Sequence, residues 1–187
     1  GPCVRNSSTT HLLDKVAKHF GEKCYEVPVG FKHISAKMVQ TNAVVGGESS
    51  GGLAVRGHIL GKDGIYAAAL LVEMIAVTGR LLSELYQEII NTFGTYYSKE
   101  LDYTLTEEKK ENLIQTLFID KLLPSFPIGV EKVSYLDGCK IYFKNGGFLV
   151  VRLSGTEPLI RVCCEMPLKE QTDLICFRIL KFLSLAD

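Results

Sequence analysis

The chain has 187 residues, a length that fits one ordinary domain or two small ones and excludes a large multidomain enzyme. Hydrophobic residues make up 47% of the chain and charged residues 22%, which is typical of a globular protein with a buried core. The 21 basic and 21 acidic residues cancel, so no global field attracts nucleic acid or an anionic membrane. Any anion site must therefore be local.

Apolar periodicity and turn residues predict six elements in the first half of the chain. They are helices at 11–20, 35–40, 65–77 and 81–93, and strands at 23–27 and 43–45. Between 28 and 32 we expect a loop, and four glycines in the seven residues 46–52 disfavour regular structure and allow close approach to a ligand. Residues 95–102 resemble an extended connector, where we place a domain boundary.

The second half of the chain changes from helical to strand periodicity. It predicts a helix from Thr106 to about Leu123, strands at 130–136, 140–143, 148–153 and 159–165, and a closing helix at 169–185. Turn residues at 137–138 and 145–147 indicate antiparallel hairpins. We therefore expect an α/β protein: a mixed α/β sandwich over 1–95, a connector over 96–105, and a small α+β domain over 106–187 with helix–antiparallel sheet–helix order, as in the TBP-like fold.

No apolar stretch approaches the roughly 20 residues needed to span a bilayer, so we predict no membrane association. Six cysteines occur without a C-x-x-C pair, which argues against a zinc site and against a disulfide framework. We expect reduced thiols and a cytoplasmic location.

The segment Arg152–Arg161 (RLSGTEPLIR) is the first candidate site. Two guanidinium groups flank a turn with two hydroxyls and a glycine, which offers charged, neutral and backbone donors around one small space. Strand alternation places Arg152 and Ser154 on one face, and Pro158 favours the return of Arg161 toward the same point. This pattern suits a phosphate, although a charged hairpin with solvated arginines has the same residue types.

The second candidate is Gly47–Gly52, where Glu48 and neighbouring hydroxyls lie on a glycine-rich loop. Carboxylates and hydroxyls can bind the hydroxyls of a sugar, and the glycines leave room for its ring. A flexible turn is the alternative, because one glycine-rich stretch is a weak signal. Lys32 is a third candidate, and a lone lysine is usually an ordinary surface residue.

Five segments together resemble one enzyme family. They are Ser8–Asp14 (STTHLLD), Pro28–Lys32 (PVGFK), Gly46–Gly52 (GGESSGG), Lys62–Gly64 (KDG) and Arg152–Arg161 (RLSGTEPLIR). The set is similar to the C-terminal half of α-D-phosphohexomutases of the bacterial phosphoglucomutase/phosphomannomutase type. The resemblance implies that 1–95 is the third domain of such an enzyme and 106–187 the fourth.

The resemblance also implies site residues. The family's sugar-recognition loop falls on Glu48 and Ser50, and Ser49 stands where a second Glu is more usual. Its phosphate-binding loop falls on Arg152, Ser154, Gly155, Thr156 and Arg161. Lys32 matches an active-site lysine of related phosphoglucomutases and is grouped with the sugar-binding residues.

His58 and Lys62 align with a polar stretch after the sugar loop. They are weaker candidates, and a structural role fits each of them at least as well. The form of the Glu48 loop resembles that of the glucose and mannose enzymes more than that of the glucosamine branch. The sequence does not decide between glucose and mannose as the sugar of the substrate.

The family's phosphoserine motif (T-x-S-H-N-P-like) and its Mg²⁺ loop (D-x-D-x-D-R-like) are both missing. Phosphoryl transfer needs an in-line nucleophile and charge neutralisation, so we predict no catalytic residue, metal ligand or cofactor in this chain. The complete enzyme, an isomerase and intramolecular phosphotransferase, is expected to use Mg²⁺ and a glucose 1,6-bisphosphate-type activator. Because the chain also lacks an initiating Met, we interpret it as a fragment that is inactive alone.

The expected partners are hexose phosphates, such as glucose 1-phosphate and glucose 6-phosphate or their mannose equivalents, and the N-terminal domains of the same enzyme. A stand-alone, non-catalytic sugar-phosphate-binding module is an alternative, because folds and loops persist without activity. A protein-interaction or nucleic-acid module is another, but neutral charge and the lack of interleaved Arg and aromatic residues argue against RNA.

Overall fold

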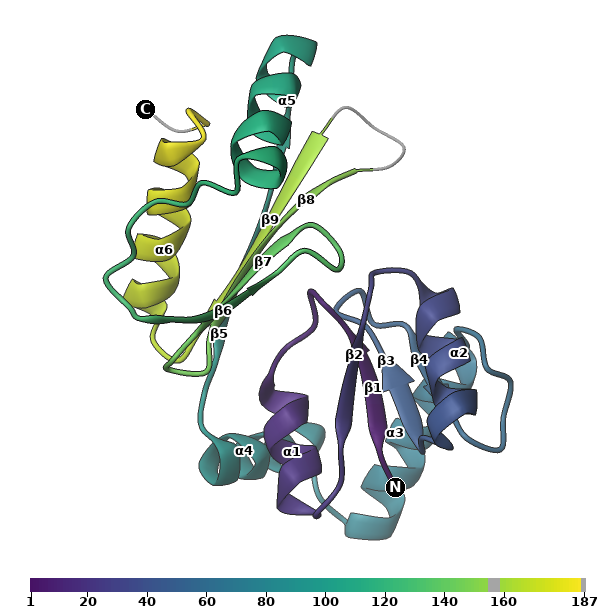
Figure 1. Ribbon diagram of the computed structural model, residues 1–187. Helices are drawn as coiled ribbons and strands as arrows, with labels where there is room; N and C mark the ends of the chain where they lie inside the picture. Colours follow the sequence, from purple (N-terminus) through teal and green to yellow (C-terminus); the bar gives the residue numbers. More distant parts are fainter. Residues whose placement is uncertain (155–158, 186–187) are drawn as a thin grey trace. The chain divides into compact units, whose positions relative to one another are not determined.

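The computed structural model describes residues 1–154 and 159–185. The chain forms two compact units, Gly1–Thr95 (unit 1) and Tyr96–Asp187 (unit 2). Each unit has its own β-sheet and its own hydrophobic core (Figure 1). The two mixed α/β units confirm the predicted fold class.

Unit 1 is built on a four-stranded sheet with the order β2-β1-β3-β4. The strands are β1 (Cys3–Asn6), β2 (Cys24–Val27), β3 (Val45–Gly47) and β4 (Leu53–Val55). β1 pairs in parallel with β2 and β3, and β4 is antiparallel to β3. The loop between β3 and β4 therefore carries the Glu48 candidate at one end of the sheet.

Two helices cover opposite sides of this sheet, α1 (Leu12–His19) and α2 (Phe31–Thr41) (Figure 1). The core of unit 1 forms on the α2 side, where Ile34 and Met38 pack against the sheet. A Cβ at Gly46 would lie 2.5 Å from atoms of both side chains, so this position needs glycine for α2 to pack closely on β3. Part of the predicted glycine-rich loop thus belongs to a strand.

A buried arginine fixes α1 and β2 to β1. Arg5 donates to both carboxylate oxygens of Asp14, at 2.6 and 3.0 Å, and to Glu26 at 2.7 Å. Burial alone would lower the pKa of Arg5, but the two carboxylates outweigh it and raise the pKa above its usual value. These ion pairs hold α1 and β2 in place against β1, because moving either element away would leave buried charged groups unpaired.

Unit 1 ends with α3 (Gly64–Thr78) and α4 (Leu82–Phe93). No single helix in the described part of the chain has the length and hydropathy to cross a membrane. The two helices pass that test only when they are joined, across an 85° bend.

Unit 2 has a five-stranded antiparallel sheet with the order β5-β9-β8-β7-β6. The strands are β5 (Tyr97–Thr104), β6 (Val130–Ser134), β7 (Cys139–Phe143), β8 (Phe148–Leu153) and β9 (Leu159–Met166). The predicted connector at 96–105 is wrong, because residues 97–104 form the edge strand β5 along the whole of β9. The hairpin turns are confirmed, with glycines of positive φ at Gly138 and Gly146.

The helices of unit 2 lie on one side of the sheet, where its core forms (Figure 1). They are α5 (Glu107–Ile114), continued by a π-helical turn η1 (Gln115–Ile119), and α6 (Lys169–Phe182). The hydroxyl of Thr106 caps α5 as predicted, but the helical segment ends at Ile119 instead of Leu123.

Two further expectations for unit 1 are corrected. The short strands β1 and β4 were not predicted, and α2 begins at Phe31, four residues before the expected start. Lys32 is therefore in the first turn of a helix and not in a loop. None of the six cysteines, all of which lie in the described residues, takes part in a disulfide, and all are buried except the half-buried Cys24.

Candidate functional site

The Glu48 loop, residues 48–52, has a defined backbone. The N–H of Glu48 donates to the carbonyl of Gly52, and the N–H of Gly51 donates back to the carbonyl of Glu48, each at 3.0 Å. Gly51 has a φ of +88°, which a residue with a side chain adopts only with strain. A Cβ at Gly52 would lie 3.0 Å from the Glu48 carboxylate and from the Lys62 stem, so a glycine at this position allows the two side chains to meet.

The Glu48 carboxylate is enclosed by donors, and its side chain is only 7% exposed. The Ser50 hydroxyl donates to it at 2.8 Å, Lys62 forms an ion pair with it, and the Asn6 amide lies 3.4 Å away. Burial alone would raise the pKa of Glu48, but the hydrogen bonds from Lys62 and Ser50 hold it below its usual value. Glu48 is therefore an ionised acceptor.

Two buried polar residues support this loop from behind. The Thr9 hydroxyl donates to the Asn6 side-chain oxygen at 2.8 Å and accepts the N–H of Ser49 at 3.1 Å. The loop backbone is thus tied to the end of β1. Sequence reasoning missed Asn6 and included Thr9 only as part of the segment Ser8–Asp14, because the contact joins residues forty positions apart.

Lys62 and Lys32 have different positions. The Lys62 ammonium pairs with Glu48 and lies 5.5 Å from the ring of Phe31, the first residue of α2. Lys32 is the next residue of that helix and is exposed. A cation in the first turn of a helix is disfavoured by the helix dipole, whereas an anion there is favoured. Through Phe31, the first turn of α2, which also carries Lys32, lies next to Lys62.

His58 has a structural role. Its Nε2 lies 2.8 Å from the Asp63 carboxylate, and its ring stacks on Tyr66 at 4.0 Å. Asp63 accepts the N–H of Tyr66 and caps α3, and this bond together with His58 lowers the pKa of Asp63. Of the two weaker candidates, Lys62 contacts Glu48 and His58 holds the start of α3.

In unit 2, Arg152 on β8 is directly opposite Arg161 on β9. Paired residues of neighbouring antiparallel strands point to the same face, so the two guanidinium groups share one side of the sheet. Ser154 N–H donates to the carbonyl of Leu159 at 2.9 Å, which closes the base of the turn. The candidates Gly155 and Thr156 lie outside the described residues.

Each arginine has a carboxylate nearby that the sequence did not indicate. Arg152 Nε forms an ion pair with Asp137 Oδ2 at 3.0 Å, and this nitrogen atom has no hydrogen-bond acceptor among the described residues. Arg161 Nε is 3.9 Å from Asp102 Oδ1, and Asp102 is opposite Arg161 on β5. Like charges directly across a sheet destabilise it, so these carboxylates compensate for the arginine pair.

The turn before β7 determines where Arg152 lies. Gly138 has a φ of +81°, and a Cβ there would lie 2.6 Å from Arg152 Cγ and closer still to the Val151 carbonyl. Asp137 supplies the ion-pair partner, and Gly138 supplies the space for the arginine stem.

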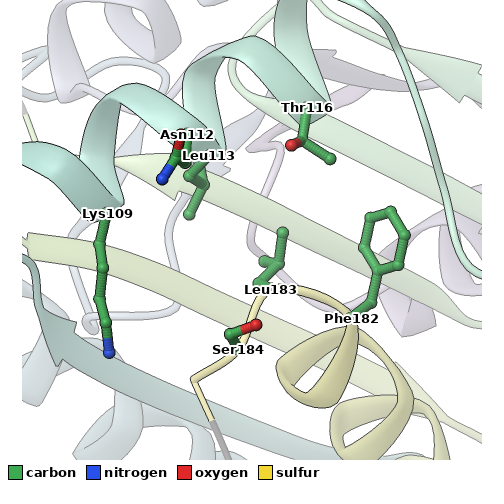
Figure 2. Close-up of a pocket in the computed structure, with 7 residues that line it drawn as sticks. All are labelled: Lys109, Asn112, Leu113, Thr116, Phe182, Leu183 and Ser184. Atoms are coloured by element: carbon green, nitrogen blue, oxygen red, sulfur yellow. The ribbon is translucent and has the colours of Figure 1, made fainter.

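Unit 2 has a separate cavity of about 160 Å³, and Figure 2 shows residues that line it. It is lined by residues of α5, η1 and the end of α6, including Lys109, Thr116 and Phe182, and by no candidate site residue. In the part of the chain that the structure describes, no three His, Cys, Asp or Glu residues gather as a metal site would require.

Comparisons with known proteins identify the family. Residues 1–93 match the family model described as phosphoglucomutase/phosphomannomutase, alpha/beta/alpha domain III. Residues 105–181 match the model of the C-terminal domain of the same family. The chain therefore belongs to the phosphoglucomutase/phosphomannomutase family, as the resemblance of its motifs predicted.

Individual relatives are similar to it over most of its length. The phosphoglucomutase/phosphomannomutase of Thermococcus kodakarensis is 31% identical over 171 residues, 91% of this chain and 35% of the relative. The phosphoglucosamine mutase of Rubrobacter xylanophilus is 29% identical, over 96% of this chain and 36% of the relative. The crystal structure of the phosphoglucomutase parafusin from Paramecium shares the fold, with a TM-score of 0.76 and 24% identity over 99% of this chain and 38% of that one. The chain spans about a third of the length of the curated relatives it matches.

Proposed function

We propose that this chain is the substrate-binding part of a phosphohexomutase that interconverts hexose 1-phosphate and hexose 6-phosphate, with glucose or mannose as the sugar. The observation that carries the proposal is the direct pairing of Arg152 with Arg161 at the base of the family's phosphate loop. The Glu48 loop, with its ionised carboxylate, supports the sugar half of the proposal.

The arginine pair suits a phosphate ester for electrostatic reasons. Two guanidinium groups on one face repel each other, and an anion placed between them removes that repulsion and gains charge-assisted hydrogen bonds. The Arg161–Asp102 pair is long and about half exposed, so its loss costs little when a phosphate binds. In this proposal Ser154, Gly155 and Thr156 add hydroxyl and backbone donors.

The Glu48 loop suits sugar hydroxyls. An ionised carboxylate accepts hydrogen bonds from neighbouring hydroxyls, and Ser50 can both donate and accept. Lys32 would reach the same ligand from the first turn of α2. Because its backbone is already hydrogen-bonded and tied to Thr9, this loop needs little ordering when a sugar binds.

A fixed site for the distal phosphate explains how one enzyme can serve both half-reactions. The sugar turns over between them, so that either end faces the same phosphoserine, and the remote phosphate helps to align the reacting end. In this proposal the phosphoserine and Mg²⁺ belong to the other domains of the enzyme. The N-acetylphosphoglucosamine mutase of Aspergillus fumigatus, which shares the fold, has been crystallised in complex with GlcNAc-6P and magnesium.

The binding test replaces each arginine in turn. Arg152→Ala or Arg161→Ala should weaken the binding of glucose 6-phosphate by about 1.5 to 3 kcal/mol, or roughly 10- to 150-fold, the range of a charge-assisted hydrogen bond. Titration calorimetry measures this, with the exposed Arg178→Ala on α6 as the control. Equal affinity in the parent protein and both variants would contradict the assignment.

A second test concerns catalysis. We expect the purified chain to leave glucose 1-phosphate unconverted, with or without Mg²⁺, because it lacks the family's nucleophile motif. A coupled assay for glucose 6-phosphate measures this. Turnover that survives repurification and is lost in Arg161→Ala would contradict the proposal.

The cytoplasmic location of the protein stays a prediction.

A further inference from the structure

Two pairs of cysteines among the described residues have thiols that hydrogen-bond with each other. The first pair is Cys3 on β1 and Cys24 on β2, and the second is Cys164 on β9 and Cys176 on α6. Two adjacent thiols can be oxidised to a disulfide if their positions allow the bond and an oxidant can reach them. The geometry and the accessibility of each pair therefore decide how it responds to an oxidant.

Cys3 and Cys24 are directly opposite each other in the sheet of unit 1. Their strands are parallel neighbours, so the two side chains point to the same face and their Cα atoms are about 4.8 Å apart. A disulfide joins residues whose Cα atoms are about 4.4 to 6.8 Å apart. The strand register thus holds the two sulfur atoms where a bond can form without a large movement of the backbone.

This pair lies on the α1 side of the sheet and is open to small molecules. Arg5, two residues after Cys3, contacts Asp14 of α1, and alternate residues of a strand share a face. Cys3 lines a cavity of about 450 Å³ beside α1, and another lining residue, Phe20, is 72% exposed. Cys24 is half-buried on the edge strand of the sheet. A small oxidant can therefore reach both thiols.

The second pair is closed to solvent. Cys164 is 0% exposed and Cys176 2%, and both belong to the hydrophobic core of unit 2. Thiols in such surroundings are inert, because burial disfavours the reactive thiolate and excludes reagents. The Cys164–Cys176 pair is therefore an internal control with the same chemistry and without access.

Cys3 is the better nucleophile of the first pair. The hydrogen bond from Cys24 holds the pKa of Cys3 below its usual value, and the Arg5 guanidinium adds to this lowering. Burial and the Asp14 carboxylate act in the opposite direction without cancelling it. Since the thiolate is the form that attacks a peroxide, Cys3 is the thiol that reacts first and Cys24 is its partner.

We propose that Cys3 and Cys24 are a redox-sensitive pair that hydrogen peroxide converts into a disulfide. The Cys3 sulfur attacks one peroxide oxygen, the O–O bond breaks, and the other oxygen leaves as water with the proton of the Cys3 thiol, which gives a sulfenic acid. The Cys24 sulfur then attacks the Cys3 sulfur, the S–O bond breaks, and the hydroxyl group leaves as a second water with the Cys24 proton. The two thiols lose two electrons and the peroxide gains them, and exchange with a reducing dithiol restores the thiols.

The disulfide ties the edge strand β2 covalently to β1. Arg5 already joins these strands through its bond to Glu26, so the new bond holds elements that are paired in the reduced protein. It also closes the loop that contains α1, which reduces the conformational entropy of the unfolded chain. Oxidation is therefore expected to raise the melting temperature of unit 1. This inference goes beyond the proposed function and does not depend on it.

Peptide mass spectrometry tests the pair without any substrate. The reduced 187-residue chain is treated with a small excess of hydrogen peroxide, quenched with catalase, alkylated with N-ethylmaleimide in urea and digested with trypsin without reduction. We expect peptides 1–5 and 24–32 to become linked through Cys3 and Cys24, at least about tenfold faster than Cys164 becomes linked to Cys176. Dithiothreitol should reverse the link. When peroxide is added to the chain unfolded in urea, this difference in rate should disappear.

Several results would overturn the proposal. They are oxidation of Cys3 to an acid without a link to Cys24, equal rates for the two pairs in the folded chain, links between two chains instead of within one, and a melting temperature that does not rise on oxidation. Because none of these measurements uses a sugar phosphate, a failure here is distinguishable from a failure of the proposed function.

The variant Cys24→Ser tests the order of the two steps. Without Cys24 the sulfenic acid at Cys3 persists, so dimedone should label Cys3 in Cys24→Ser and leave it largely unlabelled in the parent chain. Equal labelling in the two proteins would show that Cys24 does not react with the oxidised Cys3. The mass spectrometry of the parent chain uses no variant, so it decides the proposal even if Cys24→Ser fails to fold.

Discussion

The two candidate binding regions differ in how their charges are held. In the Glu48 loop the carboxylate is 7% exposed and is surrounded by donors from three segments of unit 1. In unit 2, Arg152 and Arg161 are opposite each other, and their carboxylate partners lie at 3.0 and 3.9 Å. The first region is already organised for hydroxyls, whereas in the second the Arg161–Asp102 pair is long and about half exposed, so that an anion can replace the carboxylate at little cost.

This difference separates two kinds of residue. Around Glu48, buried polar groups determine the geometry of the loop. Substitutions of these groups should therefore make the backbone of the loop less ordered. Around the arginines, the strand register determines the geometry, and the neighbouring turn decides where the Arg152 stem can lie. The variants below test this contrast from the largest expected effect to the smallest.

Gly138→Ala should have the largest effect on stability. A side chain at positive φ costs about 1 to 2 kcal/mol, and displacing Arg152 and the Val151 carbonyl adds about 1 to 3 kcal/mol. Gly146→Ala is the control, because its φ is also positive but its nearest neighbour is the Tyr96 hydroxyl at 3.4 Å. The free energy of unfolding, measured by urea denaturation, should fall by at least about 1 kcal/mol more for Gly138→Ala than for Gly146→Ala. Equal losses would show that Gly138 does not position Arg152.

Thr9→Val should have an intermediate effect. It removes the acceptor of the Ser49 N–H and a donor to Asn6, at a cost of about 1 to 2 kcal/mol. Amide hydrogen exchange at residues 48–52 should accelerate, while the arginine region keeps its exchange rates. Thr41→Val is the control, since its hydroxyl donates to the carbonyl of Lys37 in the same helix, α2. Unchanged exchange rates in the Glu48 loop would show that Thr9 does not support this loop.

Lys62→Met should have the smallest effect on stability, below about 1 kcal/mol, because Lys62 is half exposed. The pKa of Glu48 is lowered in the folded protein, so its contribution is present above the unfolded pKa and is lost as pH falls through the folded one. Without Lys62 the pKa of Glu48 in the folded protein rises toward its unfolded value, so the acid loss of stability due to Glu48 is smaller and is complete at a higher pH. Carboxyl NMR titration of Glu48 measures this, and an identical midpoint in both proteins would exclude Lys62 as a cause.

The sequence was most informative where structure is local. The hairpins of unit 2 follow from period-two alternation and from glycines that tolerate positive φ at 138 and 146. α3 follows from its composition and from the turn at 62–64. The strands β1 and β4 are three or four residues long, too short for a periodic signal.

Long-range pairing explains what the sequence could not show. β5 resembles a connector because its partner, β9, begins 55 residues after β5 ends. Asp102 meets Arg161 only through that register, and Thr9 meets Ser49 across 40 residues. The candidate residues themselves were named from motifs, but their supporting partners depend on the fold.

The most direct test of the central claim is an NMR titration of the chain with glucose 6-phosphate. We expect the amide resonances of residues 46–52 in unit 1, and those of residues 152–154 and 159–161 in unit 2, to shift as the ligand is added, because the proposal assigns the sugar hydroxyls to the first region and the phosphate to the second. Shifts confined to one unit, or shifts in neither region, would contradict the account.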